Sequence, residues 1–207
     1  MLKKLLIGLI ALIYVLGGAV YWYNNVNHAY RVVTEDKVYK SGLIPPHKLD
    51  KFLIPNKIKT VIDLLEPNLH DALNPASQDD INKEAKAIEE INKKYGTNIK
   101  HINIQSSQIP NKKTLTEFYK IIDDPKNYPI HIHCYHGMGR AVMYSAIYRI
   151  EKEGWSVKKA QENTRLFKFL VSSPLHHSSF AKGRGKGDFL LNYRKRGEVN
   201  ATVDVIK

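Results

Sequence analysis

The chain has 207 residues, 43% of them apolar and 25% charged, which fits one globular domain with an appendage and excludes a disordered or disulfide-built protein. Lysine and arginine outnumber aspartate and glutamate by 32 to 20, so the net charge of +12 predicts an anionic partner. We find no recognition motif for nucleic acid, and none is expected as a partner.

An uncharged apolar segment opens the chain at residues 5–23. At about 1.5 Å per residue, a helix of this length just spans a hydrocarbon core of about 30 Å. Lys3 and Lys4 precede it, so the positive-inside bias places the N-terminus in the cytoplasm and the domain on the outer, periplasmic or extracytoplasmic, side. We therefore predict a single-pass membrane anchor at residues 1–23.

A cleaved signal peptide is the alternative interpretation of the same segment. Gly17 and Ala19 place small residues where a signal peptidase reads them. Apolar character continues from Val20 to Tyr23, beyond that cut, which favours the anchor over secretion.

Residues 24–36 are predicted to be a polar linker, residues 37–197 the main domain and residues 198–207 a tail. Apolar β-branched runs predict strands, and helical spacing with capping residues predicts helices. The predicted strands are 38–42, 60–65, 99–105 and 129–134, and the predicted helices are 46–54, 77–95, 111–124, 140–154 and 156–171. This alternation predicts an α/β fold with a mostly parallel central sheet flanked by helices.

The chemistry is concentrated where the fourth predicted strand meets a helix. Cys134, the only cysteine, ends the strand, and Gly137 and Gly139 allow a tight turn that points backbone N–H groups at one centre. Such a nest at a helix N-terminus binds an oxyanion such as phosphate. Arg140 can add a bidentate pair of donors, and the same positive field favours the thiolate of Cys134.

The pattern His133-Cys134-(five residues)-Arg140 resembles the signature loop of the protein tyrosine and dual-specificity phosphatase superfamily. The resemblance extends over residues 38–171 and includes the runs at 38–42 and 60–64. It implies a cysteine-phosphatase-like fold and hydrolysis of phosphomonoesters.

The resemblance also implies a role for each residue of the loop. Cys134 would attack phosphorus and form a phosphocysteine that water hydrolyses, while His133 would tune the thiolate and brace the loop. No metal and no cofactor is implied. The phosphate-binding residues would be Tyr135, His136, Gly137, Met138, Gly139 and Arg140.

Two departures from the family pattern bear on turnover. Ala141 stands where such enzymes usually carry Ser or Thr, so we expect slower hydrolysis of the phosphoenzyme. The segment 105–110, where family members commonly place an Asp as general acid, has no carboxylate. Glu66 is a possible general acid, with Asp63, Asp71 and His136 as other candidates, and the acid stays unassigned.

Other groups give weaker indications. The basic segment 181–197 could clamp an anionic surface or be a solvated tail, and His176-His177 is expected to face solvent rather than to bind a metal. Tyr135 and Met138 stand where inositol-lipid phosphatases often carry Lys, which argues against a highly charged inositide.

Three functions remain open on this basis. The first is a cysteine-dependent phosphatase acting on a phosphorylated protein, lipid or glycan. The second is a phosphate-binding pseudophosphatase, and the third is a rhodanese-like sulfur carrier, which Arg140 in a glycine-rich loop disfavours.

Overall fold

A five-stranded sheet forms the centre of the domain. The computed structural model describes residues 2–67, 75–165 and 178–197. The strand order is β1-β2-β5-β3-β4, with β1 antiparallel to β2 and the other neighbours parallel, so the predicted mostly parallel α/β fold is confirmed. The strands are β1 (Arg31–Thr34), β2 (Val38–Ser41), β3 (Thr60–Asp63), β4 (Lys100–Asn103) and β5 (Ile130–His133).

The parallel strands end together at one edge of the sheet. Strand β5 lies between β2 and β3, and Ser41, Asp63 and His133 are in register at the three carboxyl ends. In a parallel α/β sheet, ligands bind beyond this edge. The residues that follow these three positions are therefore the ones that can build a site.

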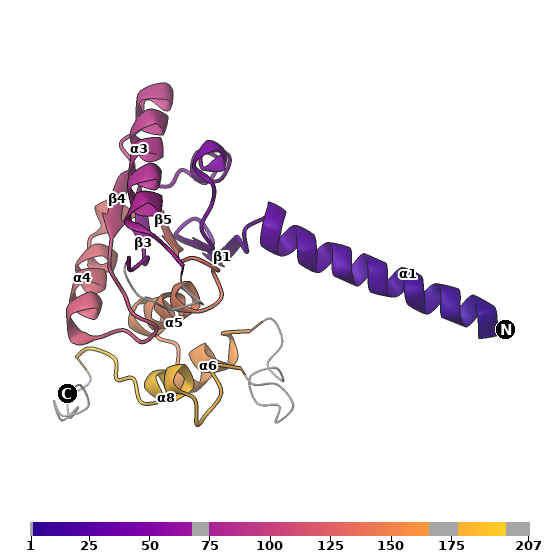
Figure 1. Cartoon of the computed structure of the whole chain (residues 1–207). Helices are drawn as coiled ribbons and strands as arrows, with labels where there is room; N and C mark the ends of the chain where they lie inside the picture. Colours follow the sequence, from indigo (N-terminus) through magenta and orange to yellow (C-terminus); the bar gives the residue numbers. More distant parts are fainter. Residues whose placement is uncertain (1, 68–74, 166–177, 198–207) are drawn as a thin grey trace.

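Helices cover both faces of the sheet (Figure 1). Buried side chains of α2 and α3 pack with Tyr39 and Val61 on one face, whereas those of α4, α5, α6 and α8 pack with Ile62, Ile130 and Ile132 on the other. The helices of the domain are α2 (Asp50–Leu53), α3 (Gln78–Tyr95), α4 (Lys112–Asp123), α5 (Arg140–Glu153), α6 (Val157–Glu162) and α8 (Gly185–Leu191), with 3-10 turns at Pro46–Lys48 and Pro125–Asn127.

Local sequence signals explain the ends of α3. The Ser77 side chain accepts from the Asp80 backbone N–H while Asp80 accepts from the Ser77 N–H, a reciprocal cap. Gly96 ends the helix with a left-handed φ of 65°. The predicted helix 156–171 ends earlier, at Glu162, where Asn163 caps the last turn, and residues 166–177 lie outside the described part.

The stretch 24–36, for which the sequence predicts a polar linker, contains regular structure. A π-helical turn, η1 (Trp22–Val26), continues the N-terminal helix α1 (Leu2–Tyr21), and β1 follows after residues 27–30. Val32 and Val33 explain the strand, because β-branched residues favour it and Val33 packs against the core. Within the described residues, α1 is the helix long and apolar enough to cross a membrane.

The basic segment 181–197 is packed onto the domain. Leu190 of α8 is buried in the core, as is Phe180 just before the segment. The Tyr193 hydroxyl donates to Glu151 Oε1 at 2.5 Å, and Arg196 pairs with Glu151 and Asp123 at 2.9 and 2.7 Å. A solvated tail would make none of these contacts, so this part of the chain is integral to the fold.

Candidate active site

The loop 134–139 joins β5 to α5 beyond the carboxyl edge of the sheet. Cys134 is 3% exposed and free of any disulfide. Gly137 has a φ of +70°, and a Cβ there would lie 2.4 Å from the Gly42 backbone nitrogen. Only glycine fits, because the backbone needs a left-handed conformation and the next loop touches it directly.

The loop after β2 braces this turn from one side. The Leu43 backbone N–H donates to the Tyr135 carbonyl at 2.9 Å. A Cβ at Gly42 would lie 3.0 Å from the same carbonyl oxygen. The run at 38–42, on which part of the family resemblance rests, therefore serves to hold the cysteine loop in shape.

Arg140 begins α5 and is held by the ends of two strands. Its guanidinium Nη1 donates to the Leu64 carbonyl at 2.6 Å and to the Ser106 carbonyl at 3.0 Å. The side chain is 3% exposed. The Tyr144 hydroxyl donates to Ser106 Oγ at 2.8 Å and so holds the residue whose carbonyl accepts from Arg140. Residues following β3 and β4 thus orient the cation beside the loop.

Lys40 is a site residue that the sequence reasoning missed. Its buried ammonium donates to the Gly137 carbonyl at 2.9 Å and to the Ala29 carbonyl at 3.2 Å. Burial lowers the pKa of Lys40 to about 8, although the nearby Cys134 opposes that shift. The charge therefore lies where a thiolate would form. Its place in the run at 38–42 was the available signal, but no local pattern marks this lysine as buried.

His133 lies in a buried ion-pair network under the loop, which the sequence did not reveal. Its Nε2 is 2.9 Å from Glu84 Oε2 and 3.7 Å from Asp63 Oδ1, and His101 Nε2 is 3.2 Å from the same Glu84 oxygen. Burial alone would lower the pKa of His133, but Glu84 and Asp63 raise it to about 9. The network thus holds a cation directly before Cys134.

The charged forms of His101 and Glu84 are favoured as well. Burial also opposes the charge on His101, but Asp63 and Glu84 raise its pKa to about 9. Burial would raise the pKa of Glu84, and His133 and His101 hold it well below its usual range. Asp63 is fixed by the Leu65 N–H at 2.7 Å and the Asn103 amide at 3.0 Å.

The same four groups are the ligand types that bind metals. One nitrogen or oxygen from each of Asp63, Glu84, His101 and His133 lies within 4.8 Å of the others. The distances between the imidazole nitrogens and the carboxylate oxygens, from 2.9 to 3.7 Å, are those of ion pairs, and the two carboxylates raise the pKa of both histidines. Two imidazolium ions and two carboxylates balance their charges, so we interpret the cluster as an ion-pair network.

The candidates for general acid lie in different surroundings. Glu66 is half-buried after β3, two residues beyond the Leu64 carbonyl that holds Arg140. His136 is exposed on the loop itself, in edge-to-face contact with the Tyr135 ring. Asp63 is committed to the ion-pair network, and Asp71 and His176-His177 lie outside the described residues.

Lys186 and Gln108 lie where the carboxylate-free segment 105–110 meets the loop. The Lys186 ammonium donates to Gln108 Oε1 at 2.6 Å. A Cβ at Gly139 would lie 2.9 Å from that ammonium nitrogen and 3.7 Å from that amide oxygen. One lysine of the basic segment 181–197 therefore borders the candidate phosphate site.

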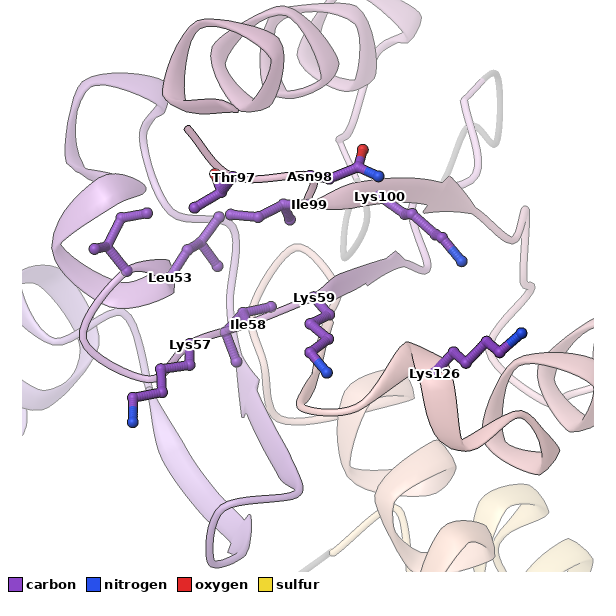
Figure 2. Close-up of a pocket in the computed structure, with 10 residues that line it drawn as sticks. Leu53, Lys57, Ile58, Lys59, Thr97, Asn98, Ile99, Lys100 and Lys126 are labelled. Carbon is purple, nitrogen blue, oxygen red and sulfur yellow. The ribbon is translucent and has the colours of Figure 1, made fainter. Parts of the chain in front are cut away.

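A separate hollow lies at the opposite edge of the sheet (Figure 2). It has a volume of about 460 Å³ and is lined by residues around the starts of β3 and β4, among them Ile58, Lys59, Ile99 and Lys100. Cys134 follows the end of β5, so this hollow is not part of the cysteine site.

A sequence model described as "DSP-PTPase phosphatase fused to NAD+ Kinase" matches residues 19–182. The chain belongs to this phosphatase family. Membership makes it a phosphoric monoester hydrolase of the dual-specificity and protein tyrosine phosphatase kind, and the resemblance seen in the sequence is confirmed. No curated protein matches the chain by sequence.

Two solved structures show the same fold as this phosphatase. The core catalytic domain of the PP-IP phosphatase SIW14 from S. cerevisiae has a TM-score of 0.51 and 20% identity, covering 80% of this chain and 85% of its own. TpbA from P. aeruginosa has a TM-score of 0.51 and 15% identity, covering 77% and 81%. At these identities the likeness extends to the fold alone.

Proposed function

We propose that the chain hydrolyses phosphomonoesters through a phosphocysteine on Cys134. The observation that carries this proposal is the convergence on one loop of a thiol, the guanidinium of Arg140 and the buried ammonium of Lys40. Three such groups at a glycine-bearing turn before a helix provide a nucleophile and an anion cradle together.

The proposed reaction has two displacements at phosphorus. The Cys134 thiolate forms a P–S bond as the P–O bond to the leaving group breaks, and the released oxygen takes up a proton. Water then attacks the phosphocysteine, the P–S bond breaks and the thiolate returns. Arg140 and the backbone N–H groups of residues 135–140 would stabilise charge on the equatorial oxygens in both steps.

The first step has a clear dependence on the leaving group. A phenolate with a low pKa, such as p-nitrophenolate, leaves without protonation, whereas an alkoxide requires an acid. Glu66 is our candidate for that acid. We therefore expect Glu66→Gln to slow hydrolysis of alkyl phosphates more than that of p-nitrophenyl phosphate.

A phosphate-binding pseudophosphatase is the second candidate function. It is favoured by buried Ala141, which provides no hydroxyl for the second step, and by the absence of a carboxylate in 105–110. Family membership favours the enzyme. A pseudophosphatase would bind phosphate analogues such as vanadate without turnover, whereas the enzyme would turn over and be inhibited by them.

We also propose that α1 anchors the enzyme in a membrane, with the catalytic domain on the outer side. The span Lys3–Tyr21 has a mean hydropathy of 2.0 and is not buried against the domain, and the pair of lysines at its start supports this orientation. Intact mass measurement of protein extracted from membranes tests it. A mature chain that begins after residue 19 would instead establish a cleaved signal.

Loss of activity on mutation of Cys134 tests the proposed function. We expect hydrolysis of p-nitrophenyl phosphate to survive chelators, to stop with vanadate and to fall to background in Cys134→Ser. Arg140→Lys should lose at least about a hundredfold, because one bidentate contact in the transition state is removed. Undiminished hydrolysis by folded Cys134→Ser would overturn the proposal.

A further inference from the structure

We propose that the cysteine loop faces the bilayer that holds α1 and acts on the phosphomonoester headgroup of a lipid in that same bilayer. This inference rests on the proposed function and adds the substrate class. It follows from where the membrane helix joins the domain and from which side chains surround the loop.

The chain leaving α1 is attached directly to the support of the cysteine loop. The Ala29 N–H donates to the Tyr23 carbonyl at 2.8 Å, which ties the turn after η1 to the helical segment. The His28 carbonyl accepts from the Gly42 N–H at 2.7 Å. Ala29 and Gly137 then share the Lys40 ammonium through their carbonyls. One buried lysine therefore links the end of the anchor to the phosphate loop.

This attachment limits how far the loop can lie from the membrane surface. Only residues 27–30 separate η1 from β1, and four extended residues span at most about 14 Å. Strand β1 begins opposite Lys40, at the carboxyl edge of the sheet. Figure 1 shows α1 leaving the domain beside β1, with α3, β4 and α4 on the far side. The carboxyl edge of the sheet, which carries the cysteine loop, is therefore the edge closer to the membrane.

Exposed apolar side chains flank the loop on this edge. Met138, inside the loop, is 48% exposed, and Ile109, in the neighbouring segment, is 38% exposed. Beyond η1, the described large hydrophobic residues with comparable exposure are these two, Val32 and Tyr95. Half of the set thus borders the site, where a bilayer interface would cover it.

Basic side chains surround the same loop. The Arg165 guanidinium donates to the Met138 carbonyl at 3.3 Å, and Lys186 lies against Gly139. Lys182 and Arg184 are exposed on the segment before Lys186, and a Cβ at Gly185 would touch Ile109. Cations of this kind attract an anionic membrane surface. A lipid phosphomonoester combines the anion, the apolar anchor and the location that this edge accommodates.

Vesicle reconstitution of the full chain tests the inference. In the first arrangement, the protein is inserted into phosphatidylcholine vesicles that also contain phosphatidate. In the second, it is inserted into vesicles of phosphatidylcholine alone, which are mixed with separate phosphatidate vesicles. Phosphate release is measured in both. We expect hydrolysis at least about tenfold faster when enzyme and lipid share a bilayer, because an anchor raises the local substrate concentration. Equal rates in the two arrangements would overturn the inference.

Two matched triple variants separate the two edges of the sheet. The first variant alters the carboxyl edge at positions outside the proposed reaction machinery: Ile109→Gln, Lys182→Gln and Arg184→Gln. The second, Tyr95→Gln with Lys57→Gln and Lys59→Gln, makes the same kind of change at the opposite edge. We expect the first to lose about tenfold on shared-bilayer phosphatidate and little on soluble p-nitrophenyl phosphate, since two cations and one apolar contact leave the interface. The second should match the wild type on both.

The outcomes distinguish this inference from the proposed function. Hydrolysis of p-nitrophenyl phosphate without hydrolysis of phosphatidate, or a higher kcat/KM on a soluble phosphotyrosine peptide, would overturn the lipid inference and leave the phosphatase intact. Equal losses on phosphatidate in the two triple variants would also overturn it. Failure to hydrolyse either substrate would contradict the proposed function and the inference with it.

Discussion

The ammonium of Lys40 is enclosed by the Ala29 and Gly137 carbonyls and lies near the Cys134 thiol. Both carbonyls are fixed by the fold, so the charge cannot move away from the loop. A cation held in this way stabilises a thiolate more than a solvated one would, because the screening by water is weak in the interior.

Replacing Lys40 with Met removes the charge and keeps a long apolar side chain. We expect iodoacetamide to alkylate Cys134 about tenfold more slowly at neutral pH, because the thiolate is the reactive form and loses a neighbouring positive charge. Lys59→Met, at the far-edge hollow, is the matched control. An unchanged alkylation rate in a folded Lys40→Met protein would show that Lys40 does not act on the thiol.

The network around His133 predicts a pH dependence of stability. The pKa of His133 and that of His101 rise from 6.5 to about 9 on folding, so their charges stabilise the fold fully below pH 6.5. That contribution is lost as the pH rises through 9. The melting temperature of the wild type should therefore decrease as the pH is raised from 6.5 to 9.

Glu84→Gln tests the source of that dependence. We expect a melting temperature lower by about 5 °C or more at pH 6.5, and a smaller fall from pH 6.5 to 9, because the main partner of both imidazolium ions is gone. Glu89→Gln, exposed on the same helix, should follow the wild type. Parallel pH profiles for Glu84→Gln and the wild type would contradict the ion-pair interpretation.

The sequence identified the residues of the loop but not those that support it. Cys134, Arg140 and the glycines occupy adjacent positions, so their spacing could be interpreted directly. Lys40, Glu84 and His101 come from three separate elements and meet only through the packing of the sheet. Nothing in the local pattern around Glu84 separates it from the exposed acids of the same helix.

At the scale of elements, the site depends on the contact between two loops that follow neighbouring strands. The loop after β2 touches the cysteine loop at Gly137, where no side chain fits. Strands β2 and β5 pair in register, so their ends bring these loops together.

Gly137→Ala tests this contact, with Gly154→Ala as its control. Both glycines have a left-handed φ, +70° and +68°, but a Cβ at Gly154 would meet nothing within 4 Å. We expect the control to lose about 1–2 kcal/mol and keep its activity. Gly137→Ala should be less stable still and should lose p-nitrophenyl phosphatase activity, because the added carbon displaces the backbone at Gly42. Activity near that of Gly154→Ala would contradict the proposed role of the contact.

Most elements could be predicted, for identifiable reasons. Strand β3 is a buried, largely β-branched run, and α3 is bounded by Ser77 and Gly96, so their local signals agree with the fold. Strand β1 and helix α8 could not be, because 31–34 is flanked by polar residues and 185–191 contains two glycines. Both depend on packing, of Val33 and Leu190 respectively, against a core assembled by other elements.

At the scale of the whole molecule, the two edges of the sheet differ in what they carry. The carboxyl edge holds the cysteine loop, the attachment of α1 and the basic segment, and the opposite edge holds the hollow lined by Lys59 and Lys100. Basic side chains, whose excess gives the net charge of +12 that predicted an anionic partner, therefore lie at both edges. The inferred membrane contact concerns the carboxyl edge, where the anchor also lies.

Capture of the phosphoenzyme is the most direct test of the central claim. The full chain is mixed with a ³²P-labelled aryl phosphate, denatured at alkaline pH during turnover, and digested to locate the label. We predict label on the peptide that contains Cys134, accumulating because Ala141 slows the second step, and none in Cys134→Ser. Turnover that leaves Cys134 unlabelled, or label on another residue, would contradict a phosphocysteine mechanism.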